Sequence, residues 1–116
     1  MKAVTISTQG MGGIAELPDT DQLDALQGAV GGLIECIHLS HLNCDMWVNE
    51  EGKMFDLPLN RIATALFTDE WSQRGYEIND YICGDVIITG TANAKGETVG
   101  LTDEQVTSLL AFLPTP

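Results

Sequence analysis

The clearest structural signals in this chain lie in residues 84–113, which read GDVIITGTANAKGETVGLTDEQVTSLLAFL. Residues 86–91 are rich in β-branched side chains, which favour a strand. Thr102 and Gln105 have the spacing of a capping box, which marks the start of a helix. Apolar residues then recur at helical spacing at Val106, Leu109, Leu110 and Leu113. We therefore expect a strand and then a helix here, with Pro114 ending the helix.

The N-terminal part of the chain predicts a strand, a loop and a helix. Residues 2–8 alternate as a strand does. Residues 9–13 contain three glycines, which predicts a flexible loop. Asp19 or Thr20 is the expected cap of a helix, and the acidic side chains there suit the positive end of the helix dipole. The apolar stripe of this helix consists of Leu23, Leu26 and Val30. Gly31 and Gly32 predict its end.

The middle of the chain predicts a three-stranded meander, then a helix and a long loop. The expected strands are residues 33–39, 45–49 and 54–55, joined by short turns. Pro58 suits the first turn of the next helix, for which Asp56 is the expected cap. The expected inward side chains of that helix are Ile62, Ala65 and Leu66. Residues 68–82 are polar and aromatic and are compatible with one extra helical turn, followed by a long loop.

These segments together predict a single α+β domain over residues 1–116, with a small, mainly antiparallel sheet and two to three packed helices. Seventeen acidic and five basic residues give a net charge of −12. Such a surface repels nucleic acid and anionic membranes. No apolar run approaches the roughly 20 residues of a membrane span, and the N-terminus does not resemble a signal peptide. We therefore expect a cytoplasmic protein with reduced cysteines.

Two cysteines and two histidines fall close together at Cys36, His38, His41 and Cys44. These residue types ligate structural zinc, and a hairpin would bring Cys44 across from the strand that carries the others. The spacing departs from the usual zinc motifs, so a core thiol and polar turn residues are the favoured interpretation. A thiol nucleophile with a histidine base is a weaker hypothesis, because no oxyanion hole or orienting group is evident. We therefore expect no catalytic residue, no bound metal and no cofactor.

A partner-binding surface is expected within residues 68–82. Aromatic side chains supply rigid contact area at binding surfaces, although they also pack back onto a protein core. The expected partner-binding residues are Trp71, Tyr76, Tyr81, Asp69 and Glu70. The alternative is a nucleotide-like small ligand, held by Asn49, Asn60 and Arg61 together with the glycines of residues 10–13. The shortage of cations counts against a ligand that carries phosphate.

Five segments follow one another in an order that resembles a known family. They are residues 30–35 (VGGLIE), 49–54 (NEEGKM), 57–63 (LPLNRIA), 84–90 (GDVIITG) and 101–105 (LTDEQ). The succession resembles a family of small proteins, each a domain of unknown function, encoded by bacteriophages, plasmids and other mobile elements. The resemblance covers about residues 23–110 and implies a stand-alone cytoplasmic accessory domain, without implying an activity.

The polar residues of these segments have two interpretations. They are Glu35, Asn49, Glu50, Asn60, Arg61 and Asp85. One interpretation gives them local structural roles in turns and helix starts. The other places them around a pocket shared by the hairpin and the middle helix.

The expected function is that of a non-enzymatic, phage-type accessory binding protein. Its acidic surface would dock on a host or phage protein, with inhibition of a host function as one outcome. The alternatives are the nucleotide-like ligand and a zinc-stabilised domain. An exposed sheet face would also allow a homodimer. These expectations depend on the carboxylates lying outward as a coat and not gathered at a reactive centre.

Overall fold

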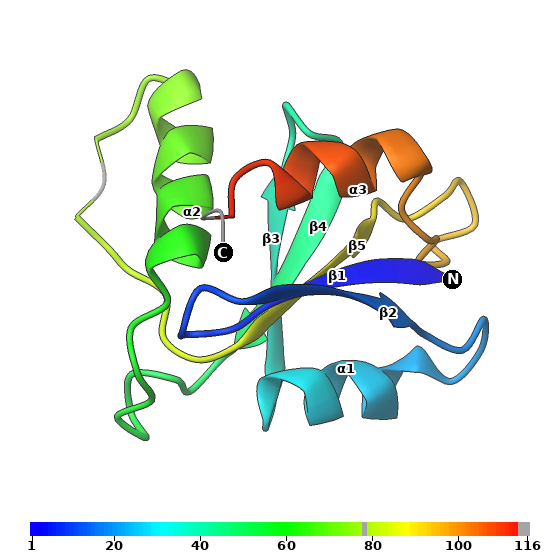
Figure 1. The fold of residues 1–116 in the computed structure, drawn as a ribbon, viewed down its shortest axis with the longest axis horizontal. Helices are drawn as coiled ribbons and strands as arrows, with labels where there is room; N and C mark the ends of the chain where they lie inside the picture. Colours follow the sequence, from blue (N-terminus) through cyan, green and yellow to red (C-terminus); the bar gives the residue numbers. More distant parts are fainter. Residues whose placement is uncertain (78, 114–116) are drawn as a thin grey trace.

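A five-stranded antiparallel sheet forms the centre of the domain (Figure 1). The structure is a computed structural model that describes residues 1–77 and 79–113. The strands are β1 (Lys2–Ile6), β2 (Gly12–Glu16), β3 (Ile34–Leu39), β4 (Cys44–Asn49) and β5 (Val86–Gly90), in the order β2-β1-β5-β4-β3. The β1–β2 and β3–β4 hairpins flank β5, which pairs with β1 and β4. The last strand in the chain therefore joins two local hairpins into one sheet.

Helices cover both faces of this sheet. Helix α1 (Gln22–Val30) packs on one face, and helices α2 (Arg61–Gln73) and α3 (Asp103–Leu110) pack on the other (Figure 1). This arrangement confirms the expected α+β class with a small antiparallel sheet and three helices. Within residues 1–77 and 79–113, no helix is long and apolar enough to cross a lipid bilayer.

The β-branched run predicted to form a strand is the central strand β5. All of its residues are buried. Val86 and Ile88 face α2 and α3, whereas Ile87 faces α1. A strand that is covered on both faces has no polar side to present to water, which explains its continuous apolar sequence.

Helix α3 confirms its sequence signals. The Thr102 hydroxyl accepts a hydrogen bond from the N–H of Gln105, and the Gln105 side chain accepts one from the N–H of Thr102. Val106 and Leu109 are buried on the inward face. The helix stop assigned to Pro114 lies outside the described residues.

Helix α1 ends as predicted but begins differently. Gly31 has a φ of 77°, a left-handed conformation that glycine adopts readily at a helix end. The helix begins after Asp21, whose side chain makes no capping hydrogen bond. Leu26 and Val30 are buried, but Leu23 is 55% exposed. The predicted apolar stripe is therefore shorter at the N-terminal end than its spacing suggested.

Two strand predictions were wrong. Residues 12–16, the first two of which were assigned to a loop, form β2, in which Gly12 and Gly13 pair with Ile6 and Thr5. Backbone pairing alone places these glycines, so no apolar alternation marks them. The third meander strand at 54–55 is absent: the chain makes consecutive turns there, and both side chains are exposed. β4 takes β5 as its second neighbour instead.

The boundaries of α2 also correct the predictions. Asn60, and not Asp56, caps the helix by accepting a hydrogen bond from the N–H of Ala63 at 3.0 Å. The helix extends to Gln73, so the extra helical turn considered at the start of residues 68–82 is present and the predicted loop is shorter. Ala65, which was predicted to face inward, is exposed, and Ala63 is buried instead. The longer helix supplies one wall of a pocket.

Candidate functional site

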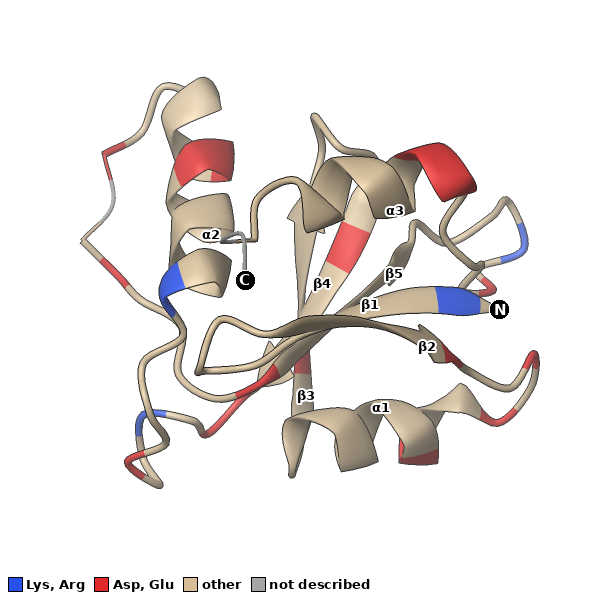
Figure 2. Ribbon diagram, in the orientation of Figure 1, with Lys and Arg blue, Asp and Glu red and all other residues tan. Residues whose placement is uncertain are grey.

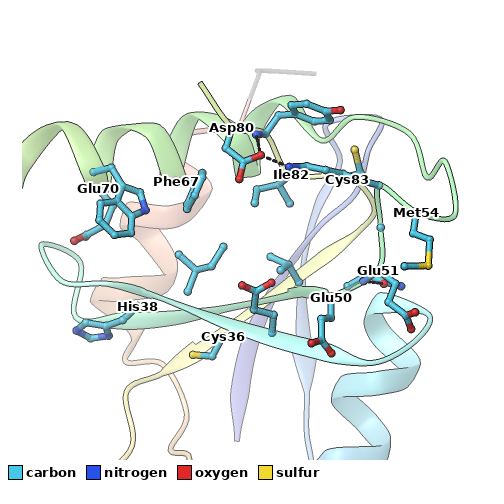
Figure 3. A pocket seen from close by; sticks show the side chains of 18 of the residues that line it. Cys36, His38, Glu50, Glu51, Met54, Phe67, Glu70, Asp80, Ile82 and Cys83 are labelled. Carbon is cyan, nitrogen blue, oxygen red and sulfur yellow. Dashed lines mark hydrogen bonds and ion pairs between the residues drawn. The ribbon is translucent and has the colours of Figure 1, made fainter. Parts of the chain in front are cut away.

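A pocket of about 630 Å³ opens between the edge strand β3 and helix α2 (Figure 3). We call it the β3–α2 pocket. Residues 35–38 of β3 line one side, and the second half of α2 lines the other. Residues 48–54 and 80–83 complete its boundary. A cavity of this volume lies within the range of about 300–1,000 Å³ that is typical of ligand sites.

Apolar side chains from separate elements form the inner wall of the pocket. Val48, Phe67 and Ile82 are each less than a tenth exposed and belong to the main core cluster, against which Ile37 packs. The 80–83 segment is held to α2, because the N–H of Ile82 donates to the Thr64 hydroxyl at 2.9 Å. The inner wall is therefore continuous with the rigid core.

Charged side chains surround this apolar wall. The carboxylates are Glu35, Glu50, Glu51, Glu70 and Asp80, and the cations are Lys53 and Arg74. Lys53 pairs with Asp80 and lies 4.5 Å from the ring centre of Tyr81. Arg74 Nε lies 2.6 Å from Glu70 Oε2.

Both cations of the pocket are thus already bound to carboxylates. In the part of the chain that the structure describes, no cation pairs with Glu35, Glu50 or Glu51. The pocket therefore has a net negative field beside an apolar wall.

Glu70 has a structural role that its predicted place on a partner-binding surface did not suggest. Its side chain is 1% exposed, and its carboxylate accepts hydrogen bonds from the N–H and hydroxyl of Ser40 and from Arg74 Nε. His41 Nδ1 lies 3.2 Å from Glu70 Oε1, and its Nε2 lies 3.2 Å from Asp69 Oδ2. Burial alone would raise the pKa of Glu70, but hydrogen bonds from Ser40, His41 and Arg74 lower it to about 2.

The predicted aromatic residues divide between the core and the surface. Trp71 is half-buried, with its ring centre 6.3 Å from that of Phe67 and 5.6 Å from that of Tyr76. Tyr76 and Tyr81 are 62% and 46% exposed. Trp71 and Tyr81 line the pocket, whereas Tyr76 and Asp69 do not.

The residues predicted to hold a small ligand do not meet around one cavity. Asn49 lines the pocket, but its side chain donates to the Val30 carbonyl and accepts from the N–H of Glu51. Asn60 is fully buried and joins Ile6 and Gly84 to the start of α2. Of the six polar residues with two interpretations, Glu35, Asn49 and Glu50 line the pocket, and Asn60, Arg61 and Asp85 do not.

The two cysteines and two histidines considered for zinc point in different directions. Cys36 and His38 lie opposite Trp47 and Asp45, which places their side chains on the α1 face of the sheet. Cys44 belongs to the core cluster on the other face. Among the residues that the structure describes, no group of three or more cysteine, histidine or acidic side chains is placed to hold a metal. His38 Nδ1 instead lies 2.8 Å from Asp45 Oδ1.

The thiols of Cys36 and Cys44 are poorly suited to nucleophilic attack. Burial, together with the charge of Asp45, raises the pKa of Cys36 to about 11 and that of Cys44 to about 12. A thiol nucleophile needs a lowered pKa to supply thiolate at neutral pH. The pKa values of Cys36 and Cys44 are both raised instead.

The sequence interpretation missed four charged residues at the pocket: Glu51, Lys53, Arg74 and Asp80. Arg74 follows Glu70 by four residues, a spacing that joins side chains on one face of a helix. That signal was hidden because most of residues 68–82 were assigned to a loop. Lys53 and Asp80 are distant in sequence, so no local pattern joins them.

These features define a class: a small three-layered α+β domain with a negatively charged pocket at one edge of its sheet. The chain belongs to the family described as Domain of unknown function (DUF3846), whose model matches residues 1–113. No curated protein and no solved structure matches the chain.

Proposed function

We propose that this protein is a non-enzymatic binding domain that docks on another protein through the β3–α2 pocket. The observation that carries the proposal is the pairing of an apolar inner wall with three carboxylates, Glu35, Glu50 and Glu51, that have no cationic partner in the described part of the chain. An apolar centre surrounded by charge is the usual anatomy of a protein-binding surface.

The distribution of charge supports this proposal. Acidic residues are spread over helices, strands and loops (Figure 2). In the described chain the buried acids are Asp45 and Glu70, and each has close polar partners. The remaining acids stay at least partly exposed, where they attract a basic partner and accelerate its encounter.

We further propose that the partner is a host or phage protein in the cytoplasm, and that the chain is an accessory factor of a mobile element. This part rests on the sequence resemblance. Inhibition of a host function would follow if the docked surface of the partner is itself a working site.

The test is affinity capture from a bacterial lysate at low and at physiological salt. The unchanged protein is compared with Glu35→Lys/Glu50→Lys and with Glu104→Lys, an exposed substitution on α3 outside the pocket. We expect a protein that the unchanged chain and Glu104→Lys retain, more strongly at low salt, and that the pocket variant loses. Identical retention by the pocket variant would exclude this pocket as the docking site.

A small molecule is a second candidate, because the cavity volume falls in the range of ligand sites. The unpaired carboxylates favour a cationic compound over a nucleotide, since Lys53 and Arg74 are already paired. Thermal unfolding with a panel of polyamines and nucleotides tests this candidate. A ligand at 100 times its Kd would add about 2.7 kcal/mol of stability. If no compound raises the unfolding temperature, the small-molecule candidate is excluded.

A further inference from the structure

The outer edge of β3 can be assigned atom by atom from its pairing with β4. The N–H of Glu50 donates to the Leu33 carbonyl at 2.8 Å, in the same register that pairs Glu35 with Val48. In an antiparallel pair, residues whose backbone groups point at the partner strand alternate with residues whose groups point away. Glu35, Ile37 and Leu39 therefore bond to β4. The backbone groups of Ile34, Cys36 and His38 point out of the sheet.

These outward groups have no strand beside them in the described chain, because β3 is the last strand of the sheet. Among the described residues, the one side-chain hydrogen bond to them is from Arg74 Nη2 to the His38 carbonyl, which at 3.5 Å is long. Sheet edges are commonly protected by charged side chains, above all lysine, or by proline. β3 (IECIHL) contains neither lysine nor proline, and its one acidic residue is Glu35. The edge is thus open to a further strand.

The same strand also lines the β3–α2 pocket, so backbone and side-chain recognition coincide there. Residues 35–38 border the pocket. Glu35 and Ile37 have their side chains on the pocket face, because they share that face with Val48 and Met46. A strand placed beside β3 would point alternate side chains into the pocket, since side chains alternate across a strand.

We propose that the β3–α2 pocket takes an extended, basic segment of a partner protein, which adds to the sheet as a further strand beside β3. This inference rests on the proposed docking function and specifies its partner. The pocket specifies two successive pocket-facing side chains of this segment. The side chain that lies beside Glu35 is lysine or arginine, and the side chain that lies beside Ile37 and Phe67 is apolar.

The charge of the pocket selects this occupant over a second copy of the chain. Pairing of two β3 edges would bring together two sets of the carboxylates Glu35, Glu50 and Glu51, and like charges placed across strands repel. A basic segment instead supplies the cations that these carboxylates lack. Strand addition to a sheet edge is an established mode of peptide recognition, in which side-chain pockets provide the specificity.

The first experiment selects binders to the full chain from a displayed library of random peptides longer than β3. We expect lysine or arginine and an apolar residue two positions apart. Selection on Glu35→Lys should replace the basic preference with an acidic one, and selection on Glu104→Lys should not. Recovery of no peptide sensitive to Glu35 would overturn the docking function and the strand addition together.

The second experiment isolates strand addition. In Cys36→Pro the lost N–H points out of the sheet, so the β3–β4 ladder stays intact and the edge is blocked. We expect Cys36→Pro to weaken binding of the selected peptide by about tenfold or more, and Cys36→Ala, which keeps the backbone N–H, to weaken it much less. Circular dichroism checks the fold of both variants.

Two measurements on the unchanged protein complement the comparison of Cys36→Pro with Cys36→Ala. The peptide should slow hydrogen exchange at the N–H groups of Ile34, Cys36 and His38. N-methylation of the peptide should weaken binding at alternate positions only. A peptide that depends on Glu35 but protects none of these amides and tolerates every methylation would overturn strand addition and leave the docking function standing. Dimerisation of the free chain through β3 would also overturn it.

Discussion

The carboxylate of Glu70 accepts hydrogen bonds from both the backbone N–H and the hydroxyl of Ser40, each at 2.6 Å. Glu70 lies on α2 and Ser40 in the turn between β3 and β4, so the contact joins the two walls of the β3–α2 pocket. Because the carboxylate is buried, these bonds are poorly replaced by water. One ionised side chain therefore joins α2 to the turn that follows β3.

This contact predicts acid sensitivity. The pKa of Glu70 is lowered from 4.5 to about 2. A group with a lowered folded-state pKa contributes its full stability above its unfolded pKa and loses it as the pH falls through the folded one. We expect about 3 kcal/mol of unfolding free energy to be lost between about pH 4.5 and pH 2. Urea unfolding at several pH values measures the loss.

The Glu70→Gln variant provides the comparison for this prediction. It should be less stable than the unchanged protein at pH 7 and show a flatter dependence on acid. Glu104→Gln, at an exposed position, should retain the original dependence. Parallel pH curves for the unchanged protein and Glu70→Gln would show that the carboxylate does not stabilise the fold through its charge.

Asn60 predicts a second large stability effect. Its side-chain amide donates to the carbonyls of Ile6 and Gly84, each at 3.0 Å, and its oxygen accepts from the N–H of Ala63. Asn60→Ala leaves these buried groups unsatisfied, so we expect a loss of about 3 kcal/mol in denaturant unfolding. Asn60→Asp keeps the cap but turns an oxygen toward two carbonyls, and it should also destabilise.

The matched control for Asn60 is Asn93, whose side-chain oxygen accepts two backbone hydrogen bonds in an exposed turn. Asn93→Ala should cost less than about 1 kcal/mol, because water can replace the lost bonds. Equal losses at the two positions would mean that burial does not set the cost.

The elements that the sequence predicted well are those with local signals. β5 has a β-branched run, and α3 has a capping box and a regular apolar stripe. The β3–β4 hairpin has two apolar segments joined by a short turn. Each of these signals lies within a few residues of the element that it predicts.

The elements that were missed depend on distant partners. The insertion of β5 between two hairpins is set by contacts across the whole chain, which no local pattern records. The end of α2 was missed because Glu70 occupies an inward position where the helical pattern calls for an apolar residue. Its partner Ser40 lies 30 residues earlier, so the buried carboxylate looked like a surface acid. The pocket could not be predicted for the same two reasons, because its walls are β3 and the second half of α2.

Gly52 predicts a steric effect at the boundary of the pocket. A Cβ at this position would lie 2.6 Å from the Cys83 carbonyl oxygen, closer than such atoms approach in proteins. Gly52→Ala must therefore push the 50–57 turn away from residue 83. We expect a loss of about 1–3 kcal/mol. Unfolding by urea measures it.

The control for Gly52 is Gly28, an exposed position within α1 where a Cβ meets nothing within 4 Å. Gly28→Ala should stabilise the protein by about 0.5–1 kcal/mol, because alanine favours a helix. If Gly52→Ala is as stable as the unchanged protein, the 50–57 turn has room to move. The boundary of the pocket is then more flexible than the structure indicates.

The cysteine thiols are expected to react slowly with disulfide reagents. Burial and the charge of Asp45 raise the pKa of Cys36 to about 11, although Cys36 is accessible to reagents. In a Cys83→Ser background, we expect Cys36 to react with a disulfide reagent at pH 8 on the order of 100-fold more slowly than a free thiol. Cys44, which is buried, should react only on unfolding.

Asp45→Asn tests the cause of the slow reaction. Removal of the carboxylate charge should lower the pKa of Cys36 and speed its reaction, while burial, the larger cause, remains. The pH dependence of the reaction rate reports the pKa directly, and circular dichroism confirms that the variant is folded. A rapid reaction of Cys36 in the unchanged protein at neutral pH would contradict the raised pKa. It would also return the thiol to consideration as a nucleophile, which the proposed binding function excludes.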